Sequence, residues 1–150
     1  MKIGLIGAGR LGICLALLIE KTGLEVIASD MREDYIKDLQ NKKINSAEPQ
    51  VQELLEQSKK IEFTTDNSKV IRESDIIFTL VQTPSLEDGS YDVSAVWKVV
   101  EDIKREMNKI ANYPKSFVVG CTTNPGDCDQ FKKSLPDSVD VYYNPEFIAQ

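Results

Sequence analysis

The sequence contains no histidine among its 150 residues. Histidine is the usual general base and a common metal ligand near neutral pH, so chemistry of either kind needs groups from outside this chain. Cysteine is scarce too: Cys14, Cys121 and Cys128 make an odd count without metal-ligand spacing, and we predict no metal site. Because the first residues already have the pattern of a strand, we expect no signal peptide, which favours a reducing, cytoplasmic setting.

Long apolar runs and clusters of basic residues are also missing. No apolar stretch approaches the ~20 residues of a membrane-spanning helix, so we expect no membrane partner. Lysine and arginine are scattered along a chain of net charge −6, which argues against a nucleic-acid surface. The remaining composition, 41% hydrophobic and 28% charged residues, is typical of a soluble globular domain with its own core.

The first thirty residues carry the most informative local pattern. A short apolar run over residues 2–6 is followed by Gly7-Ala8-Gly9-Arg10-Leu11-Gly12, which fits G-x-G-x-x-G. An apolar segment of helical length follows over residues 13–19, and a second strand-like run ends at Asp30. This order of strand, glycine turn, helix, strand and acid is the fingerprint of a βαβ dinucleotide-binding unit.

Each position of this fingerprint has a physical role. Gly7 permits the tight turn out of the strand, Gly9 leaves room for a pyrophosphate at the backbone, and Gly12 lets the helix pack closely on the strand. The helix begins near Gly9, so the amides of its first turn, including those of Arg10 and Leu11, point toward the phosphates. We predict that these five residues hold the phosphates of the cofactor.

The acid of the fingerprint bears on the choice of cofactor. Asp30 lies 18 residues after Gly12 (30 − 12), close to the ~20 expected for the acid that binds an adenosine ribose. A carboxylate there accepts hydrogen bonds from both ribose hydroxyls and repels a 2′-phosphate, which favours NAD over NADP. Arg32 argues in the opposite direction, because an arginine near this acid can accommodate a 2′-phosphate.

Strand-like and helix-like patterns alternate along the rest of the chain, with an additional helix between the second and third strands. This alternation predicts an α/β fold, a Rossmann-type doubly wound parallel sheet with helices on both faces, in one domain over residues 1–150. The expected strands cover residues 2–6, 24–29, 61–64, 75–81, 116–121 and 139–143. The expected helices start near residue 9, cover 33–42, start at 49, cover 66–71 and 92–107, and end at 135.

Ligands of such sheets bind beyond the carboxyl ends of the strands, where this sequence has hydroxyls, prolines and an acid. Thr83 and Thr122 can bond a ribose, a pyrophosphate or a substrate alcohol; alternatively, each hydroxyl ties down its own loop. Pro84 and Pro125 stiffen these loops. Glu146, after the last strand, can serve as a general base or can be a solvated loop acid.

Three other side chains receive structural interpretations. Cys128 is expected in the first turn of a helix, where the dipole lowers a thiol pKa, but without a visible base or partner thiol we favour a structural role. Cys121, at a strand end, is expected to be packed. Trp97 lies on the apolar side of the helix over residues 92–107, and we predict that it belongs to the core rather than stacking on a ligand.

Three strand-end motifs are more specific than the glycine fingerprint. They are Val81-Gln82-Thr83-Pro84, the loop Cys121-Thr122-Thr123-Asn124-Pro125-Gly126, and Asn144-Pro145-Glu146-Phe147. In this order they resemble the V-P-T-P, S-T-V-P-P-G and N-P-E-F motifs of the nucleotide-sugar dehydrogenases, the UDP-glucose 6-dehydrogenase and GDP-mannose dehydrogenase family. The resemblance covers the whole chain as the N-terminal cofactor domain of that family.

The resemblance implies an enzyme that oxidises a sugar C6 alcohol to a carboxylate in two hydride transfers to NAD, through a thiohemiacetal and a thioester on a cysteine. By resemblance Thr83 and Pro84 contact the cofactor. Thr122 lies beside the cofactor and positions the substrate oxygen or a catalytic water, and Glu146 is the acid/base of the hydrolytic step. Tyr35 and Asn124 depart from the family pattern, which often has a lysine or arginine beside the adenosine and a proline in the loop.

Several parts of the family's enzymes have no counterpart in these 150 residues. They are the dimer-forming helix, the sugar-nucleotide domain, the nucleophilic cysteine and the catalytic lysine. We therefore expect the chain alone to bind NAD without turnover, and both the nucleotide-sugar substrate and the usual homodimer to require the rest. Two alternatives stay open: a cofactor domain of the 3-hydroxyacid or 6-phosphogluconate dehydrogenases, and a stand-alone nucleotide-sensing module.

Overall fold

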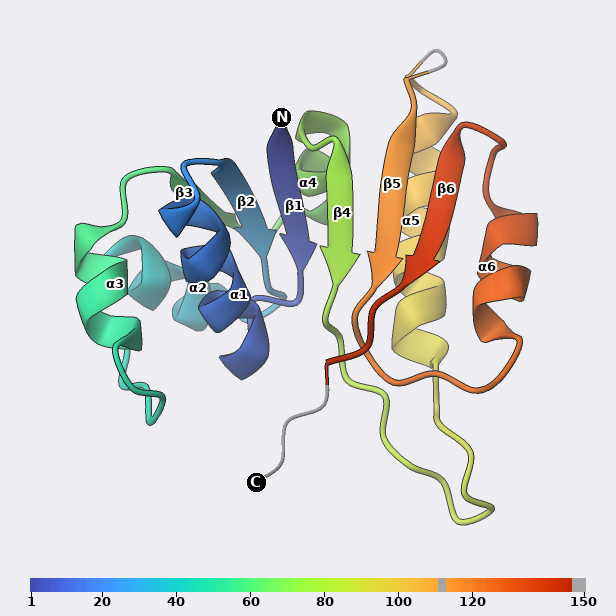
Figure 1. Ribbon diagram of the computed structural model, residues 1–150, viewed down its shortest axis with the longest axis horizontal. Helices are drawn as coiled ribbons and strands as arrows, with labels where there is room; N and C mark the ends of the chain where they lie inside the picture. The colour runs from blue at the N-terminus through green and yellow to red at the C-terminus, as the bar shows by residue number, and fades with distance from the viewer. Residues whose placement is uncertain (111–112, 147–150) are drawn as a thin grey trace.

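Six parallel strands form one sheet in the computed structural model, which describes residues 1–110 and 113–146 (Figure 1). The order across the sheet is β3-β2-β1-β4-β5-β6. All neighbouring strands run in the same direction, so their carboxyl ends meet at one edge, the lower edge in Figure 1. The strands are β1 (Lys2–Ile6), β2 (Glu25–Ser29), β3 (Ile61–Thr64), β4 (Ile76–Thr79), β5 (Lys115–Val119) and β6 (Val139–Tyr143).

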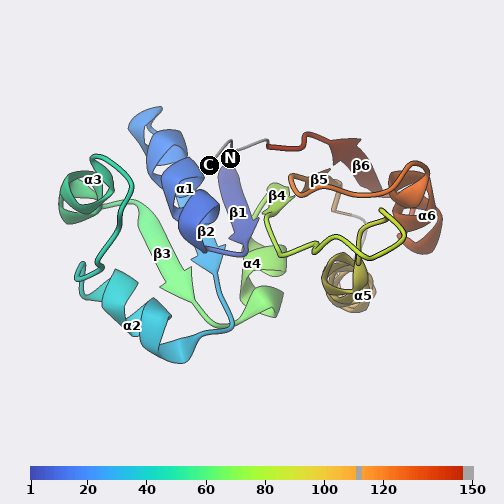
Figure 2. The same cartoon turned by 90° about the horizontal axis from the view of Figure 1, so that it is seen from below.

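Helices cover the sheet from both sides, which confirms the predicted doubly wound fold. Figure 2 shows α1 and α3 on one side of the sheet and α5 and α6 on the other. The helices are α1 (Arg10–Lys21), α2 (Glu33–Gln40), α3 (Val51–Gln57), α4 (Asn67–Glu73), α5 (Ser94–Met107) and α6 (Asp127–Ser134). The longest of these has 14 residues, and none of the described helices is long and apolar enough to cross a bilayer.

Each face of the sheet has its own hydrophobic core. Leu5 packs with residues of α1, α2 and α3, whereas its neighbour Ile6 packs with residues of α4, α5 and α6. Successive side chains of a strand point to opposite faces, so a strand covered on both faces is apolar throughout. Trp97 packs against the core that contains Ile6, edge-on to Phe131 with ring centroids 4.8 Å apart. This contact confirms its predicted place in the core.

The strand β4 ends earlier than its apolar run. It ends at Thr79, although the run continues to Val81. Its neighbour β1 ends at Ile6, whose carbonyl accepts a last hydrogen bond from the Leu80 amide at 2.8 Å. Beyond that bond β1 has turned away and the ladder has no further partner on this side. The strand β5 also ends two residues before its predicted boundary.

The loop predicted over residues 82–91 contains a short hairpin. Ser85 and Tyr91 form an isolated antiparallel bridge, and the Leu86 amide donates to the Ser90 carbonyl at 2.8 Å. Figure 1 shows this segment extending beyond the carboxyl ends of the strands. The dipeptide Asp-Gly in its middle is a turn signal, so the pairing has a local cause in the sequence.

A buried lysine joins α4 to β5 at the opposite edge of the sheet. The Nζ atom of Lys115 donates to the carbonyl oxygens of Ser74 and of Arg72, the latter at 3.4 Å. These carbonyls belong to the end of α4, where helical carbonyls lack partners and a positive charge is favoured. Burial lowers the pKa of Lys115, and nothing in the local sequence indicates this contact.

A buried carboxylate joins α4 to α5. The side chain of Glu106 is 1% exposed and accepts hydrogen bonds from Lys109 Nζ at 2.8 Å and from Arg72 Nη1 at 3.1 Å. The hydrogen bond from Lys109 has the largest effect and outweighs the opposing effect of burial, so that the pKa of Glu106 falls to about 2. The carboxylate is therefore ionised and paired across the helix interface at neutral pH.

Candidate functional site

The chain changes direction across the sheet between β1 and β4. From β1 it continues into α1 on one face, and from β4 it continues through the hairpin into α5 on the other face. The two strands are neighbours, so the connections separate at their carboxyl ends. Such a switch point is where ligands bind in open α/β sheets. The segments that carry every predicted site residue begin at this edge (Figure 1).

Two glycines of the fingerprint are required by the packing of the protein itself. Gly7 has φ of 101°, and a Cβ there would lie 2.6 Å from the Leu80 carbonyl oxygen. A Cβ on Gly12 would overlap the carbonyl oxygen of Gly7. Both predicted structural roles, the tight turn and the close approach of helix to strand, are thus present in the geometry.

Gly9 is different, because the protein leaves space beside it. A Cβ on this residue would meet only one atom within 4 Å, Nη2 of Arg32 at 3.8 Å. Its φ of −62° is one that any residue adopts. The packing of the described residues therefore does not explain why glycine stands here, whereas a pyrophosphate lying against the backbone does. The residues present fit such a group.

The N-terminus of α1 is prepared for an anion. Within the described chain, no side chain caps Gly9 and no acid lies in the first turn of α1. In contrast, α2 carries Glu33 and Asp34 in its first turn. The first amides of a helix lack intrahelical acceptors and carry a partial positive charge. The amides at the start of α1, which include those of Arg10 and Leu11, can therefore bind phosphate oxygens.

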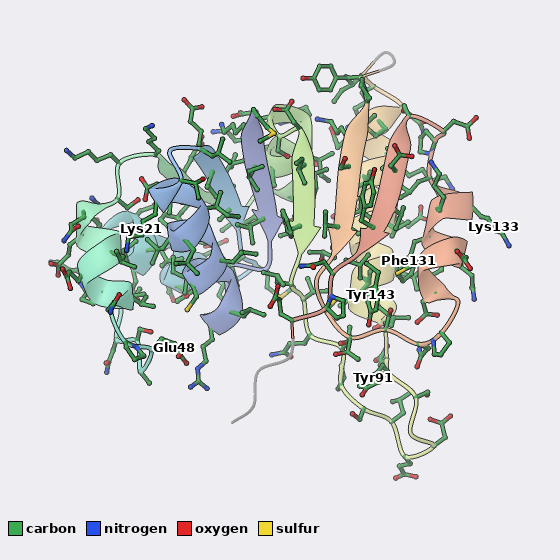
Figure 3. The ribbon with its side chains drawn as sticks, in the orientation of Figure 1. Lys21, Glu48, Tyr91, Phe131, Lys133 and Tyr143 are labelled. Atoms are coloured by element: carbon green, nitrogen blue, oxygen red, sulfur yellow. The ribbon has the colours of Figure 1, made fainter. Side chains whose placement is uncertain are left out.

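The side chain of Arg10 is held by Glu48, a contact that the sequence analysis did not predict. Arg10 Nε forms an ion pair with Glu48 Oε1, from the segment before α3. Figure 3 shows Glu48 below the carboxyl ends of the strands. The pair joins the first turn of α1 to the segment over residues 41–50. Thirty-eight positions separate the two residues, so no local pattern could have indicated the contact.

Asp30 lies directly after β2, at the predicted place. The preceding carbonyl, of Ser29, accepts hydrogen bonds from the amides of Gly7 at 2.9 Å and Ala8 at 2.8 Å, which joins the phosphate loop to the end of β2. The Asp30 side chain is 9% exposed and bonds to Arg32. Burial alone raises the pKa of Asp30, but the bonds from Arg32 outweigh it and the net pKa is lowered.

Thr83 and Pro84 lie between β4 and the hairpin. The Pro84 carbonyl accepts a hydrogen bond from the Asp92 amide at 2.9 Å, which closes the base of the hairpin. Thr83 is half-buried and Pro84 is exposed. Both residues therefore stand on a segment anchored at its two ends, by β4 and by the start of α5. Their predicted contacts with the cofactor stay a prediction.

The loop with Thr122 is fixed by its neighbour Asn124. The Asn124 side chain accepts a hydrogen bond from the Tyr91 amide at 2.8 Å and donates one to the Tyr91 carbonyl at 3.0 Å. The Thr123 amide also lies 3.5 Å from the hydroxyl of Tyr143. Figure 3 shows Tyr91 and Tyr143 at this edge. Thr122 is half-buried within this network.

Glu146 lies at the same edge, beyond β6. The amides of Asn144 and Glu146 donate to the carbonyls of Val119 and Gly120 at 2.9 and 3.1 Å, so the chain follows β5 past the end of the sheet. The Glu146 side chain is exposed and accepts a hydrogen bond from the Asn144 amide group at 3.2 Å. The last residue of the N-P-E-F motif, Phe147, lies outside the described residues.

The environment of each of the three thiols disfavours its thiolate form. The prediction of a lowered pKa for Cys128 is wrong: burial has the largest effect and raises this pKa, the charges of Asp127 and Asp129 raise it further, and the hydrogen bond from Thr123 does not compensate. Two acids therefore oppose the helix dipole at this site. Burial also raises the pKa of Cys14 and raises that of Cys121 to about 11, in agreement with a packed Cys121.

The strand order and the glycine loop at the switch point define a dinucleotide-binding domain of the dehydrogenase type. The chain belongs to the UDP-glucose/GDP-mannose dehydrogenase family, because the model of that family's NAD binding domain matches residues 1–150. This result confirms the predicted family and NAD as the cofactor, and it favours this family over the 3-hydroxyacid and 6-phosphogluconate dehydrogenases.

Individual relatives agree with the family assignment. The chain is 34% identical to an uncharacterized protein of Methanocaldococcus jannaschii and 29% identical to the UDP-glucose 6-dehydrogenase AglM of Haloferax volcanii, with the whole chain covered in both cases. It spans 17% and 37% of these curated relatives' lengths. A ternary complex of GDP-mannose dehydrogenase from Pseudomonas aeruginosa superimposes with a TM-score of 0.88 at 26% identity, covering 100% of this chain and 37% of the other.

Proposed function

We propose that this chain is the cofactor-binding part of an NAD-dependent nucleotide-sugar dehydrogenase that oxidises a sugar C6 alcohol, as in UDP-glucose, to the carboxylate in two hydride transfers. The observation that carries the proposal is the contrast among the fingerprint glycines. Gly7 and Gly12 are required by packing, whereas Gly9 borders open space at the N-terminus of α1. Family membership supplies the substrate class.

Each cofactor-binding residue has a proposed task. Gly7, Gly9, Arg10, Leu11 and Gly12 hold the pyrophosphate, chiefly through backbone amides of the first turn of α1. The carboxylate of Asp30, Thr83 and Pro84 on the hairpin segment, and Thr122 on the following loop extend the site along the carboxyl edge of the sheet. NAD, when bound there, accepts the hydride. The chain itself binds and orients it.

The proposed catalytic tasks fall to Thr122 and Glu146. Thr122 positions the substrate oxygen or a water, and Glu146 acts as acid/base during hydrolysis of the thioester. Their support is positional, because both residues follow strands, β5 and β6, whose carboxyl ends lie at the same edge of the sheet as the switch point. The nucleophilic thiol comes from elsewhere, since burial raises the pKa of all three cysteines of this chain.

The rest of the proposed enzyme binds the nucleotide sugar, supplies that thiol and forms the homodimer. We place the reaction in the cytoplasm. The support is that Cys14, Cys121 and Cys128 are all free thiols, a state that reducing compartments maintain.

Calorimetric titration of the chain with NAD tests cofactor binding. We expect saturable binding, and we expect Gly9→Val to abolish it while the far-ultraviolet circular dichroism stays unchanged, because the side chain fills the space of the pyrophosphate. Lys104→Val is a matched control, since it places the same side chain at an exposed position of α5. Normal NAD binding by Gly9→Val would contradict the proposed site.

Formation of NADH from UDP-glucose, GDP-mannose and UDP-N-acetylmannosamine tests the catalytic proposal. We expect no turnover by the 150-residue chain, because a nucleophile must lie within ~3–3.5 Å of the sugar C6 in near-attack geometry. In a protein that joins this chain to a sugar-nucleotide domain, Glu146→Gln should slow thioester hydrolysis and trap a covalent intermediate visible by mass. Turnover by the chain alone, or an unaffected Glu146→Gln enzyme, would overturn these assignments.

A further inference from the structure

The acid predicted to bind the adenosine ribose already has a cationic partner. Arg32 Nε donates to Asp30 Oδ1 at 2.8 Å, and Arg32 Nη2 donates to Asp30 Oδ2 at 2.9 Å. The Arg32 amide adds a third bond to Oδ1 at 3.1 Å. Paired N–H groups on both oxygens are the strongest arrangement of arginine and carboxylate. The negative charge that should repel a 2′-phosphate is therefore neutralised in place.

The guanidinium keeps donors available for another anion. It has five N–H groups, of which the carboxylate of Asp30 takes two. The Arg32 side chain is 57% exposed, so the remaining donors are open to solvent. One of its nitrogens, Nη2, also lies 3.8 Å from the position of a Cβ on Gly9. The cation therefore spans the ribose acid and the phosphate loop, between which the adenosine end of the cofactor must lie.

An aromatic ring fixes the cation in this position. The guanidinium carbon of Arg32 lies 4.2 Å from the centre of the Tyr35 ring, within the range of a cation–π contact. Tyr35 is half-buried and packs against the core of α1 and α2. An exposed pair on the same helix, Asp34 with Lys37, has a single contact at 3.4 Å and no such support. The Arg32 side chain is thus held by two groups, the Asp30 carboxylate and the Tyr35 ring.

We propose that Arg32 is a specificity-determining residue, which neutralises Asp30 and offers its free N–H groups to a 2′-phosphate, so that this site binds NADP as well as NAD. The inference rests on the proposed cofactor site and deepens it. A carboxylate alone accepts the ribose hydroxyls and rejects the phosphate; a carboxylate paired with an outward-facing arginine still accepts hydroxyls through its remaining lone pairs, and the arginine attracts the phosphate.

Calorimetric titration with both cofactors tests the proposal, and the quantity compared is the ratio of the two dissociation constants. We expect Arg32→Ala to weaken NADP binding about tenfold or more relative to NAD binding, the effect of losing charge-assisted hydrogen bonds to a phosphate. Arg32→Lys keeps the charge and should retain part of the NADP affinity. Arg105→Ala is the matched control, because it removes a similarly exposed arginine paired with an aspartate on α5. The ratio of its NADP and NAD dissociation constants should equal that of the unmodified chain.

A second measurement needs no variant and so does not depend on how the variants fold. A 2′-phosphate contact with Arg32 makes NADP binding fall more steeply with added salt than NAD binding, because salt screens exposed charges. Equal salt dependence of NADP and NAD binding would overturn the proposal. So would an Arg32→Ala protein that still binds NAD but whose ratio of NADP to NAD dissociation constants changes by less than about threefold, well below the effect of one such hydrogen bond. Failure of the unmodified chain to bind either cofactor would instead overturn the proposed function, and this inference with it.

Discussion

The side chain of Asn124 pairs with both backbone groups of Tyr91. It accepts from the Tyr91 amide at 2.8 Å and donates to the Tyr91 carbonyl at 3.0 Å. Asp127 accepts from the Asn124 amide and side chain in turn, at 2.8 and 3.0 Å. These bonds join the hairpin after β4 to the loop after β5, the two segments that carry Thr83 and Thr122. Proline, the family residue at this position, has no side-chain amide and cannot make them.

Removal of this amide should loosen both loops. We expect Asn124→Ala to lower the free energy of unfolding by about 1–3 kcal/mol, because it leaves the half-buried backbone groups of Tyr91 without partners. Proteolysis should become faster within residues 82–91. Thermal unfolding and limited proteolysis followed by mass spectrometry measure both effects. Asn45→Ala, at an exposed position, is the control, and an Asn124→Ala protein as stable and as resistant as this control would refute the role of Asn124.

Gly12 and Gly9 should differ in how much stability is lost when each is replaced by alanine. We expect Gly12→Ala to destabilise the domain by about 3 kcal/mol or more, because its Cβ would overlap the Gly7 carbonyl, part of a backbone that cannot easily move. Gly9→Ala should change stability by no more than about 1 kcal/mol, the usual effect at a helix N-cap. Urea unfolding of both variants decides the matter. Equal losses would mean that Gly9 is also a packing residue.

The carboxylate of Glu106 should make stability depend on pH in the acid range. Its pKa is lowered from 4.5 to about 2 in the folded protein. A lowered folded-state pKa adds stability above the unfolded value, and this stability is lost as the pH falls from about 4.5 toward 2. We expect Glu106→Gln to be less stable at pH 7 by about 1–3 kcal/mol and to depend less on pH in this window. Denaturant unfolding between pH 2 and pH 7 measures the free energy of unfolding of both proteins, and Glu87→Gln in the exposed hairpin is the control.

The thiols should differ in their rates of alkylation. Cys121 is 9% exposed with a pKa of about 11, so only about one molecule in a thousand carries its thiolate at pH 8. We expect iodoacetamide to label Cys121 more slowly than the half-buried Cys14 and Cys128. Peptide mapping after timed labelling gives the three rates, and labelling in urea, where the rates should converge, is the control. Fast labelling of Cys121 in the folded protein would contradict its buried environment.

The fold could be predicted because its causes are local in the sequence. Continuous apolar runs mark strands that are covered on both faces, and the run over residues 2–6 became β1 without change. The short segments over residues 61–64 and 139–143, which mix apolar and polar residues, became the edge strands β3 and β6 with the predicted bounds. The additional helix predicted from Pro49 onward is α3, at Val51–Gln57. Strand ends were less predictable. A strand stops where its neighbour stops, as β4 does beside Ile6, and the apolar run of one strand carries no information about its neighbour.

The candidate site also contains some features that the local sequence determines and others that only the fold determines. Gly7, Gly12 and Asp30 lie at the predicted positions because one βαβ unit of thirty residues determines them. The pairs Arg10–Glu48 and Asn124–Tyr91 join residues 38 and 33 positions apart, and only the folded backbone brings them together. The pKa of Cys128 shows the same limit: the helix position was predicted, but burial of the thiol in the folded protein decides that the pKa is raised.

The sequence by itself determined the family, the order of strands and helices, and the glycine turn at the first strand, because each depends on residue spacing along the chain. The tertiary structure alone decided that the carboxylate of Asp30 is paired with the guanidinium of Arg32. Asp30 and Arg32 are only two positions apart, yet whether the guanidinium faces the carboxylate depends on Tyr35 beneath it and on the start of α2. Side-chain direction follows from packing, and spacing cannot specify it.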